Sequence, residues 1–289
     1  MAIKAKYEFS SAGKWSLMVR PEKWSDGLWV DVQRHLASEG PVRHPKTKRF
    51  RYPVGGDGRE YYLKIYHRSR ASGALKDLLR DSSAVRALKQ GEALAEFGFQ
   101  APLAVAAGEE RYLRSLRRAF LLTLAVEAKP LAVALREHFA PPLDLAALRR
   151  KRGWLRQLAL EVSRLHQWGF VHGDLVPSNI LVCNQGGEAT FFYMDNDRTR
   201  RYPRWIPHLL WTRNLIQLNR FVLPGISLQD RMRFLRIYLG EKPWGKRERR
   251  LIRHLEMRTR KRRKECEHVE AQASFRELMR WNGPFAKNL

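Results

Sequence analysis

The chain has 289 residues, 44% of them hydrophobic, and its 55 Lys and Arg against 29 Asp and Glu give a formal net charge of +26. The apolar content excludes an intrinsically disordered chain, and the length allows one two-lobed domain or two ordinary domains. Such a positive field attracts phosphate-bearing partners, whether nucleotides, nucleic acid or anionic lipid, and does not distinguish among them.

Two cysteines, Cys183 and Cys266, lack the spacing of a CxxC pair or a metal site, so we expect reduced thiols in a cytoplasmic protein. The first residues contain no apolar segment typical of a secretory signal. The longest apolar run, residues 119–126, is far shorter than the about 20 residues that span a bilayer. Any membrane contact is therefore expected to be peripheral.

Residues 1–40 mix short strand-like and polar pieces. Residues 48–54 and 59–66 then predict two β-strands, the second rich in Tyr and Ile. The intervening residues 55–58, with the sequence GGDG, are typical of a tight turn because glycine supplies positive φ angles. Together these segments predict a β-hairpin.

Helical spacing follows in residues 83–97, and Gly98 is suited to end that helix. Residues 119–126 predict a buried strand. The strongest helical pattern covers residues 145–168, with apolar side chains on one face, and Gly169 is a suitable residue just past its C-terminus.

Two short strands are predicted at residues 180–182 and 190–194, and the chain from Trp205 onward is mostly helical and basic. Strands followed by helices indicate an α+β fold with a β-rich N-lobe and a helical C-lobe. We place the N-lobe at residues 1–127 and the C-lobe at residues 128–289.

Candidate catalytic residues lie in the segment 172–179, HGDLVPSN, which follows the long helix at once. Asp174 precedes Asn179 by five residues, and Asp195 ends the apolar strand of the next hairpin. Phosphoryl transfer needs a carboxylate near the attacking hydroxyl and oxygen ligands for a divalent metal. The spacing predicts that Asp174 is the catalytic carboxylate and that Asn179 and Asp195 bind Mg²⁺.

The run 172–182, HGDLVPSNILV, resembles the atypical kinases that carry HGD where protein kinases carry HRD. These include aminoglycoside and choline phosphotransferases and the lipopolysaccharide kinases that phosphorylate Kdo or heptose. The chain length, the strand around Lys64, the short link 98–102 and the arginine-rich C-terminus are most similar to the lipopolysaccharide kinases. The resemblance covers roughly residues 40–240 and implies a bilobal protein-kinase-like fold that uses ATP and Mg²⁺.

The same resemblance assigns Lys64, a lysine inside a β-strand, to the α- and β-phosphates of ATP. Glu92 on the following helix is the expected partner of Lys64 in this ATP-binding site, with Glu96 as the alternative. The glycine cluster 55–58 is too close to Lys64 to be the phosphate-covering loop. That loop is expected near residues 42–48, which are basic rather than glycine-rich.

Asp195-Asn196-Asp197 stands where protein kinases carry Asp-Phe-Gly, and Gly173 replaces their loop arginine. Asp197 is either a second metal ligand or a partner of Arg198 or Arg200. Both departures argue against a regulated activation loop and favour a constitutive small-molecule or lipid kinase.

Residues 242–264 are dense in Lys and Arg with interleaved apolar residues. This pattern is typical of a basic amphipathic helix on an anionic membrane and equally of an RNA-binding segment. No signature of an RNA-binding fold accompanies it, so nucleic acid is the less favoured partner.

We therefore expect an ATP-dependent sugar kinase that acts on Kdo or heptose of the lipopolysaccharide inner core. It would lie in the cytoplasm, peripheral to the inner membrane, with the lipid A–core acceptor and anionic lipid as partners. The first alternative is an aminoglycoside- or choline-like phosphotransferase, against which the net charge argues because such substrates are often cationic. The second is a pseudokinase or RNA-binding module.

Overall fold

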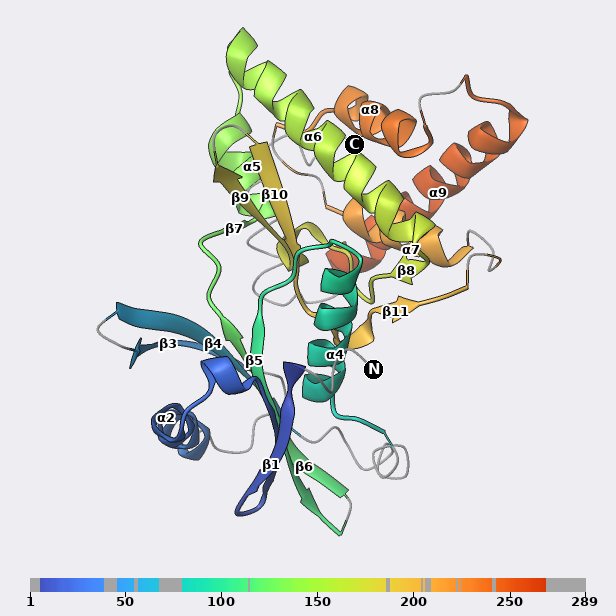
Figure 1. Cartoon of the computed structure of the whole chain (residues 1–289). Coiled ribbons are helices and arrows are strands. Elements are labelled where there is room, and N and C mark those ends of the chain that lie inside the picture. Colours follow the sequence, from blue (N-terminus) through green and yellow to red (C-terminus); the bar gives the residue numbers. More distant parts are fainter. Residues whose placement is uncertain are drawn as a thin grey trace. The chain divides into compact units, whose positions relative to one another are not determined.

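The computed structural model describes residues 6–38, 46–54, 57–67, 80–113, 115–185, 188–203, 205, 209–221, 223, 225–240 and 243–268 (Figure 1). The chain forms two compact units. Unit 1 comprises Met1–Glu127 together with Asp195–Thr199, and unit 2 comprises Ala128–Met194 together with Arg200–Leu289. The short stretch 195–199 thus belongs to unit 1, although the C-lobe expected from the sequence included it. No helix among the described residues is long and apolar enough to cross a membrane.

Unit 1 is built on a six-stranded sheet with the order β1-β2-β5-β6-β4-β3, in which all neighbouring strands are antiparallel. Its strands are β1 Glu8–Ala12, β2 Trp15–Val19, β3 Lys46–Val54, β4 Asp57–His67, β5 Ala104–Tyr112 and β6 Ser115–Leu124. The predicted hairpin is confirmed, with Val54 opposite Asp57 in β3 and β4. Residues 55 and 56, in the expected turn, lie outside the described part of the chain.

Two helices cover the two faces of this sheet, α2 (Asp26–Ala37) and α4 (Ser83–Glu96). Side chains alternate between the faces along each strand. In β4, Leu63 and Ile65 pack with α2, whereas Tyr66 packs with Ala84 and Leu88 of α4. Lys64 has the register of Tyr66, so the sheet itself directs the lysine to the face that α4 covers.

Helix α2 was not expected from the sequence. Its N-terminus is capped by Ser25, whose Oγ accepts a hydrogen bond from the backbone of Leu28 at 3.2 Å. Leu28, Val32 and Leu36 recur every four residues and are buried against the sheet. These apolar residues are visible in the sequence, but they form only a narrow stripe within a polar segment, so they did not indicate a helix.

Unit 2 is mainly helical (Figure 1). Its helices are α5 Leu131–Phe139, α6 Leu145–Gln167, α7 Leu209–Leu218, α8 Leu228–Tyr238 and α9 Lys246–His268. A small sheet joins β7 (Lys129–Pro130), β9 (Ile180–Gln185) and β10 (Glu188–Tyr193) in the order β10-β9-β7. The predicted helix 145–168 and the predicted hairpin are confirmed, and α5 is an addition.

The end of α6 determines where the segment 172–179 begins. Gly169 follows the helix with φ +84°, and a Cβ atom at this position would lie 2.1 Å from the carbonyl oxygen of Tyr202. Any larger residue would therefore clash as well as be strained. The chain then enters β8 (Phe170–Val171), which pairs with β11 (Arg200–Arg201) and leads into His172.

Glu92 of α4 is buried in a polar cluster of unit 1 that we call the Glu92 cluster, formed with Lys6, Tyr7 and Arg20. Its Oε1 accepts hydrogen bonds from Arg20 Nη2 at 2.6 Å and from the Tyr7 hydroxyl at 2.8 Å, and its Oε2 accepts one from Lys6 Nζ at 3.0 Å. Arg20 and Tyr7 are themselves buried. The cluster therefore ties α4 to the N-terminal segment.

This arrangement corrects the expected pairing of Glu92 with Lys64. The carboxylate that Lys64 contacts is Asp195, and Glu92 is turned toward the three N-terminal side chains. The physical reason is that a buried Arg20 needs a carboxylate partner. Glu22 contacts it at 3.3 Å from the exposed side, and Glu92 is the buried carboxylate, at 2.6 Å. Glu96, the alternative, is exposed at the end of α4.

Burial alone would raise the pKa of Glu92, but hydrogen bonds from Lys6 and Tyr7 and the charge of Arg20 outweigh burial and lower it. A carboxylate whose pKa is lower in the folded state stabilises the fold above its unfolded-state pKa of about 4.3. That contribution is lost as the pH falls through the folded-state pKa.

We predict that Glu92→Gln lowers the free energy of unfolding by about 3 kcal/mol at pH 7, because the buried Arg20 loses its countercharge. The variant should also lose part of the wild-type decline in stability below about pH 4.3. Urea denaturation at several pH values measures both effects. Glu96→Gln, on the exposed face of the same helix, is the control and should stay within about 0.5 kcal/mol of wild type. Equal effects of the two substitutions would contradict this role of Glu92.

Candidate functional site

The segment 172–179 runs from β8 into β9 and is held in unit 2 by a buried histidine. The ring of His172, 1% exposed, bonds through Nε2 to the carbonyl oxygen of Met194 at 2.8 Å. Because a carbonyl only accepts, Nε2 carries the proton. Nδ1 is then the acceptor for the backbone N–H of Asp174 at 3.1 Å. The two ring contacts of His172 thus hold the backbone at Asp174 in position.

Helix α7 supplies two amide side chains to the same segment. Asn214, fully buried, accepts a hydrogen bond from the backbone of His172 at 2.9 Å and donates one to its carbonyl at 2.6 Å. One turn later, Gln217 Nε2 donates to Asp174 Oδ1 at 3.0 Å, and Gln217 Oε1 accepts from the backbone of Leu175 at 3.3 Å. Neither amide was expected from the sequence, because nothing in the residues of α7, which also include Thr212 and Arg213, separates these amides from exposed ones.

Asn179 holds the other side of Asp174. It ends the short helix η3 (Pro177–Asn179), and its Nδ2 donates to the backbone oxygen of Asp174 at 3.0 Å and to Oδ2 at 3.4 Å. Its backbone oxygen accepts from Met194 at 2.9 Å, which fixes the start of β9 to the end of β10. Unit 2 therefore brings Asp174 and Asn179 together, with each carboxylate oxygen of Asp174 facing an amide donor.

Unit 1 brings together the other expected pair, Lys64 and Asp195. Lys64 Nζ lies 2.5 Å from Asp195 Oδ1 and 5.3 Å from the centre of the Tyr66 ring. Both side chains keep access to solvent, with 21% of Lys64 and 40% of Asp195 exposed. The amine of Lys64 can bind an anion and the carboxylate of Asp195 can bind a cation, so the two ions could lie side by side.

Asp195 has a left-handed backbone conformation, with φ 55° and ψ 46°, directly before the short helix η4 (Asn196–Arg198). Aspartate tolerates this conformation better than most residues, but it still costs of order 1 kcal/mol. In unit 1, Arg86 of α4 donates to the backbone oxygen of Asp197 at 3.1 Å, which anchors η4 to α4. The strained residue is therefore held by its surroundings.

The tyrosine beside Lys64 remains neutral. Burial first, and then the negative charges of Asp197 and Asp195, raise the pKa of Tyr66 well above its usual range. Its hydroxyl therefore does not ionise, and its ring provides an uncharged wall beside the amine.

The residues present suit a magnesium ion in their chemistry. Asn179 and Asp195 offer amide and carboxylate oxygens, which are the hard ligands that Mg²⁺ prefers. The Nδ2 atom of Asn179 is engaged with Asp174, so Oδ1 is the atom of this side chain that suits a cation. Within the described residues, no cluster of three His, Cys, Asp or Glu side chains forms a metal site of another kind.

The expected phosphate-covering loop near 42–48 is described only from residue 46 onward, so residues 42–45 lie outside the described part. The structure also gives Asp197 a backbone contact with Arg86.

Comparisons with known proteins place the chain among kinases. The model of the lipopolysaccharide kinase (Kdo/WaaP) family matches residues 33–238. Among curated proteins, the chain is 29% identical over 199 residues to protein kinase PINOID of Oryza sativa subsp. japonica, covering 64% of this chain and 39% of that protein. It is 26% identical over 194 residues to protein kinase PVPK-1 of Phaseolus vulgaris, covering 63% of this chain and 30% of that protein. The chain thus spans well under half the length of these two relatives.

Among solved structures, the chain is similar to WaaP in complex with acyl carrier protein. The TM-score is 0.58 and the identity 22%, and the match covers 85% of this chain and 98% of that one. This likeness establishes the protein-kinase-like fold that the sequence predicted.

The family match covers more than two thirds of the chain and includes Lys64, Asp174, Asn179 and Asp195. The protein belongs to the lipopolysaccharide kinase (Kdo/WaaP) family.

Proposed function

We propose that the protein transfers the γ-phosphoryl group of ATP to a hydroxyl of Kdo or heptose in the lipopolysaccharide inner core. The observation that carries this proposal is the arrangement of Asp174, whose two carboxylate oxygens face the amides of Gln217 and Asn179. A carboxylate oriented in this way suits the one covalent task that phosphoryl transfer leaves to a protein, which is to position a hydroxyl and accept its proton.

In the proposed reaction, the sugar oxygen attacks the γ-phosphorus as the bond from that phosphorus to the ADP oxygen breaks. The hydroxyl proton passes to Asp174. Gln217 and Asn179 position the carboxylate, so that it need not reorient during the step. His172 maintains the backbone of the segment through its two ring contacts.

Lys64 is proposed to bind the α- and β-phosphates of ATP, and Asn179 and Asp195 to hold Mg²⁺. The metal would neutralise charge on the phosphate oxygens. The contact of Lys64 with Asp195 supports this division, because the amine prefers phosphate oxygens and the carboxylate prefers the cation. Glu92 is proposed to act indirectly, by fixing α4 through the Glu92 cluster rather than by holding Lys64.

The family and the charge together support an anionic acceptor at a membrane. A net charge of +26 suits a phosphorylated glycolipid better than a cationic amino sugar or choline. Helix α9 is rich in Lys and Arg, and each such residue near an anionic surface contributes about 1 kcal/mol. We propose that the protein works at the cytoplasmic face of the inner membrane. Because the solved relative is a complex with acyl carrier protein, that carrier is also a candidate partner.

The substrate is tested by transfer of ³²P from [γ-³²P]ATP to purified lipopolysaccharide that retains Kdo and heptose but lacks the outer core. We expect labelling of the sugar, and acceptors cut back to Kdo alone distinguish the two sugars. A folded protein that labels a soluble amino sugar or choline instead, or that binds RNA and labels nothing, would refute the proposed substrate.

We predict that Asp174→Asn lowers kcat by about 10²–10⁴-fold with little change in KM for ATP, because the amide cannot accept the hydroxyl proton. Steady-state kinetics with the accepted substrate measure both constants. Asp31→Asn, on helix α2, is the control and should keep wild-type kcat. Wild-type turnover in Asp174→Asn would exclude the proposed proton acceptor.

Gln217 is a positioning residue in this scheme. We predict that Gln217→Ala lowers kcat about tenfold, the equivalent of one hydrogen bond to a charged group, and leaves KM within about twofold. Gln167→Ala, which removes an exposed amide at the end of α6, should alter neither constant. A purely structural role for Gln217 would instead lower the amount of folded enzyme and leave the kcat of the folded fraction unchanged.

A further inference from the structure

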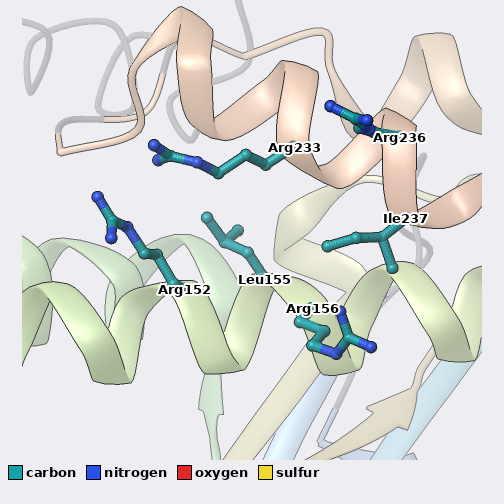
Figure 2. Close-up of a pocket in the computed structure, with 6 residues that line it drawn as sticks. All are labelled: Arg152, Leu155, Arg156, Arg233, Arg236 and Ile237. Carbon is teal, nitrogen blue, oxygen red and sulfur yellow. The ribbon is translucent and has the colours of Figure 1, made fainter. Parts of the chain in front are cut away.

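Helices α6 and α8 of unit 2 lie side by side and run in the same direction. Lys151 and Asp230, near their first turns, form an ion pair at 2.9 Å, and Ser163 Oγ donates to the backbone oxygen of Tyr238 at 3.0 Å near their ends. Between the helices is a hollow of about 270 Å³ that we call the arginine groove (Figure 2). It is lined by Arg152, Leu155, Arg156, Arg233, Arg236 and Ile237.

The two walls of the arginine groove carry the same pattern. On α6 the lining positions are 152, 155 and 156, and on α8 they are 233, 236 and 237. Each set has the i, i+3, i+4 spacing of one helical face. Each wall therefore contributes two arginines and one aliphatic side chain. The arginines are exposed, whereas Leu155 is buried and Ile237 half-buried, so an apolar floor lies beneath a cationic rim.

One end of the groove carries an arginine from each wall. Arg152 and Arg233 extend toward this end from opposite helices (Figure 2). Arg233 Nη1 donates to Asp230 Oδ1 at 3.3 Å. Asp230 is 1% exposed and is itself held by Lys151 and by the backbone of Ser227. The guanidinium of Arg233 is thus steadied by a fixed carboxylate below it.

The charge of the rim is not cancelled by that carboxylate. Asp230 is shared by Lys151 and Arg233, so one carboxylate stands against two cations, and all six lining residues are arginine or aliphatic. Arg152 and Arg156 are also an i, i+4 pair of like charges, which destabilises a helix by a few tenths of a kcal/mol. If these positions served only to pack the two helices together, acidic or apolar residues would stabilise the packing more than arginines do. The arrangement suits an anionic ligand.

Arginine is suited to phosphate because its planar fork forms two parallel hydrogen bonds to two oxygens. An arginine from each wall at one end of the groove therefore offers hydrogen-bond donors suited to the oxygens of a phosphate group. The hollow has a volume of about 270 Å³, which is room for a small polar group such as a headgroup.

The surroundings favour a phosphate that belongs to a lipid. Leu160 continues the stripe of Arg152 and Arg156 one turn further along α6, and 48% of its surface is exposed. Arg149, also exposed, lies on the same stripe at its other end. An exposed leucine in line with arginines is the pattern of a surface that meets headgroups and the adjoining hydrocarbon together.

We propose that the arginine groove binds the phosphate of an anionic lipid headgroup, with Arg152 and Arg233 as the principal ligands and the floor of Leu155 and Ile237 against the headgroup carbons. This binding does not depend on catalysis, so it is measured without ATP. It can fail while the proposed kinase activity stands, and the reverse is also true.

The test uses the full chain and two sets of vesicles, one of phosphatidylcholine alone and one that also contains phosphatidylglycerol. Arg152→Glu/Arg233→Glu is compared with Arg34→Glu/Arg51→Glu, a pair of exposed arginines in unit 1. Both double variants change the net charge equally, so general attraction to the vesicles weakens equally. We expect the groove variant to bind anionic vesicles at least tenfold more weakly than the control variant.

Arg152→Gln/Arg233→Gln removes the charges without placing a carboxylate beside Asp230, and it keeps the test valid if the first variant unfolds. Thermal melting verifies the fold of every variant. Leu160→Ser should weaken binding to anionic vesicles by severalfold while leaving affinity for soluble glycerol 3-phosphate unchanged.

Three results would overturn the proposal. The first is equal vesicle binding by the folded groove and control variants. The second is a groove variant that loses glycerol 3-phosphate but keeps vesicle binding, which would assign the groove to a free phosphate. The third is a groove variant that keeps vesicle binding but loses binding to acyl carrier protein, which would assign it to a protein.

Discussion

A single ring proton on His172 determines which contacts hold the segment 172–179 in place. The ring is buried, and the Met194 carbonyl on one side requires Nε2 to donate, so the backbone N–H of Asp174 finds an acceptor in Nδ1. A second proton on the ring would set two donors against each other at Nδ1. The position of Asp174 therefore depends on a neutral imidazole at His172.

Helix α7 provides the other contacts that hold the segment 172–179 in place. An irregular segment can be buried only if its backbone groups are paired, and Asn214 pairs both the N–H and the carbonyl of His172. Gln217, one turn later, then reaches the carboxylate of Asp174. The segment and α7 are about 40 residues apart in sequence, so the position of the Asp174 carboxylate depends on a long-range contact. In unit 1, Lys64 similarly owes its direction to strand register, and Glu92 owes its direction to the buried charge of Arg20.

The parts that sequence predicted well are those where local periodicity and motif coincide. The long helix 145–168, the hairpin around Lys64 and the spacing of Asp174 and Asn179 follow from patterns a few residues long. The features that the sequence did not predict depend on contacts with residues far away along the chain. Nothing local to Glu92 indicates that it faces Tyr7 and Arg20, which are more than 70 residues away. The buried amides of α7 likewise have no local mark that separates them from exposed amides.

The positively charged residues give a second example of features that local sequence does not show, because their density along the chain differs from their clustering in space. Along the chain, arginine and lysine are densest in α9, where they occupy many positions around the helix and so remain dispersed in space. The arginine groove is sparser in sequence, with its two halves about 80 residues apart, yet the folding of α6 against α8 brings two arginines of each helix to one hollow. Lys151 and Asp230 form an ion pair between the two helices. Asp230 is also paired with Arg233, so this single carboxylate is shared by two cations and the groove keeps an excess of positive charge. Specific recognition of an anion depends on such convergence, whereas a high count of basic residues produces attraction without a site.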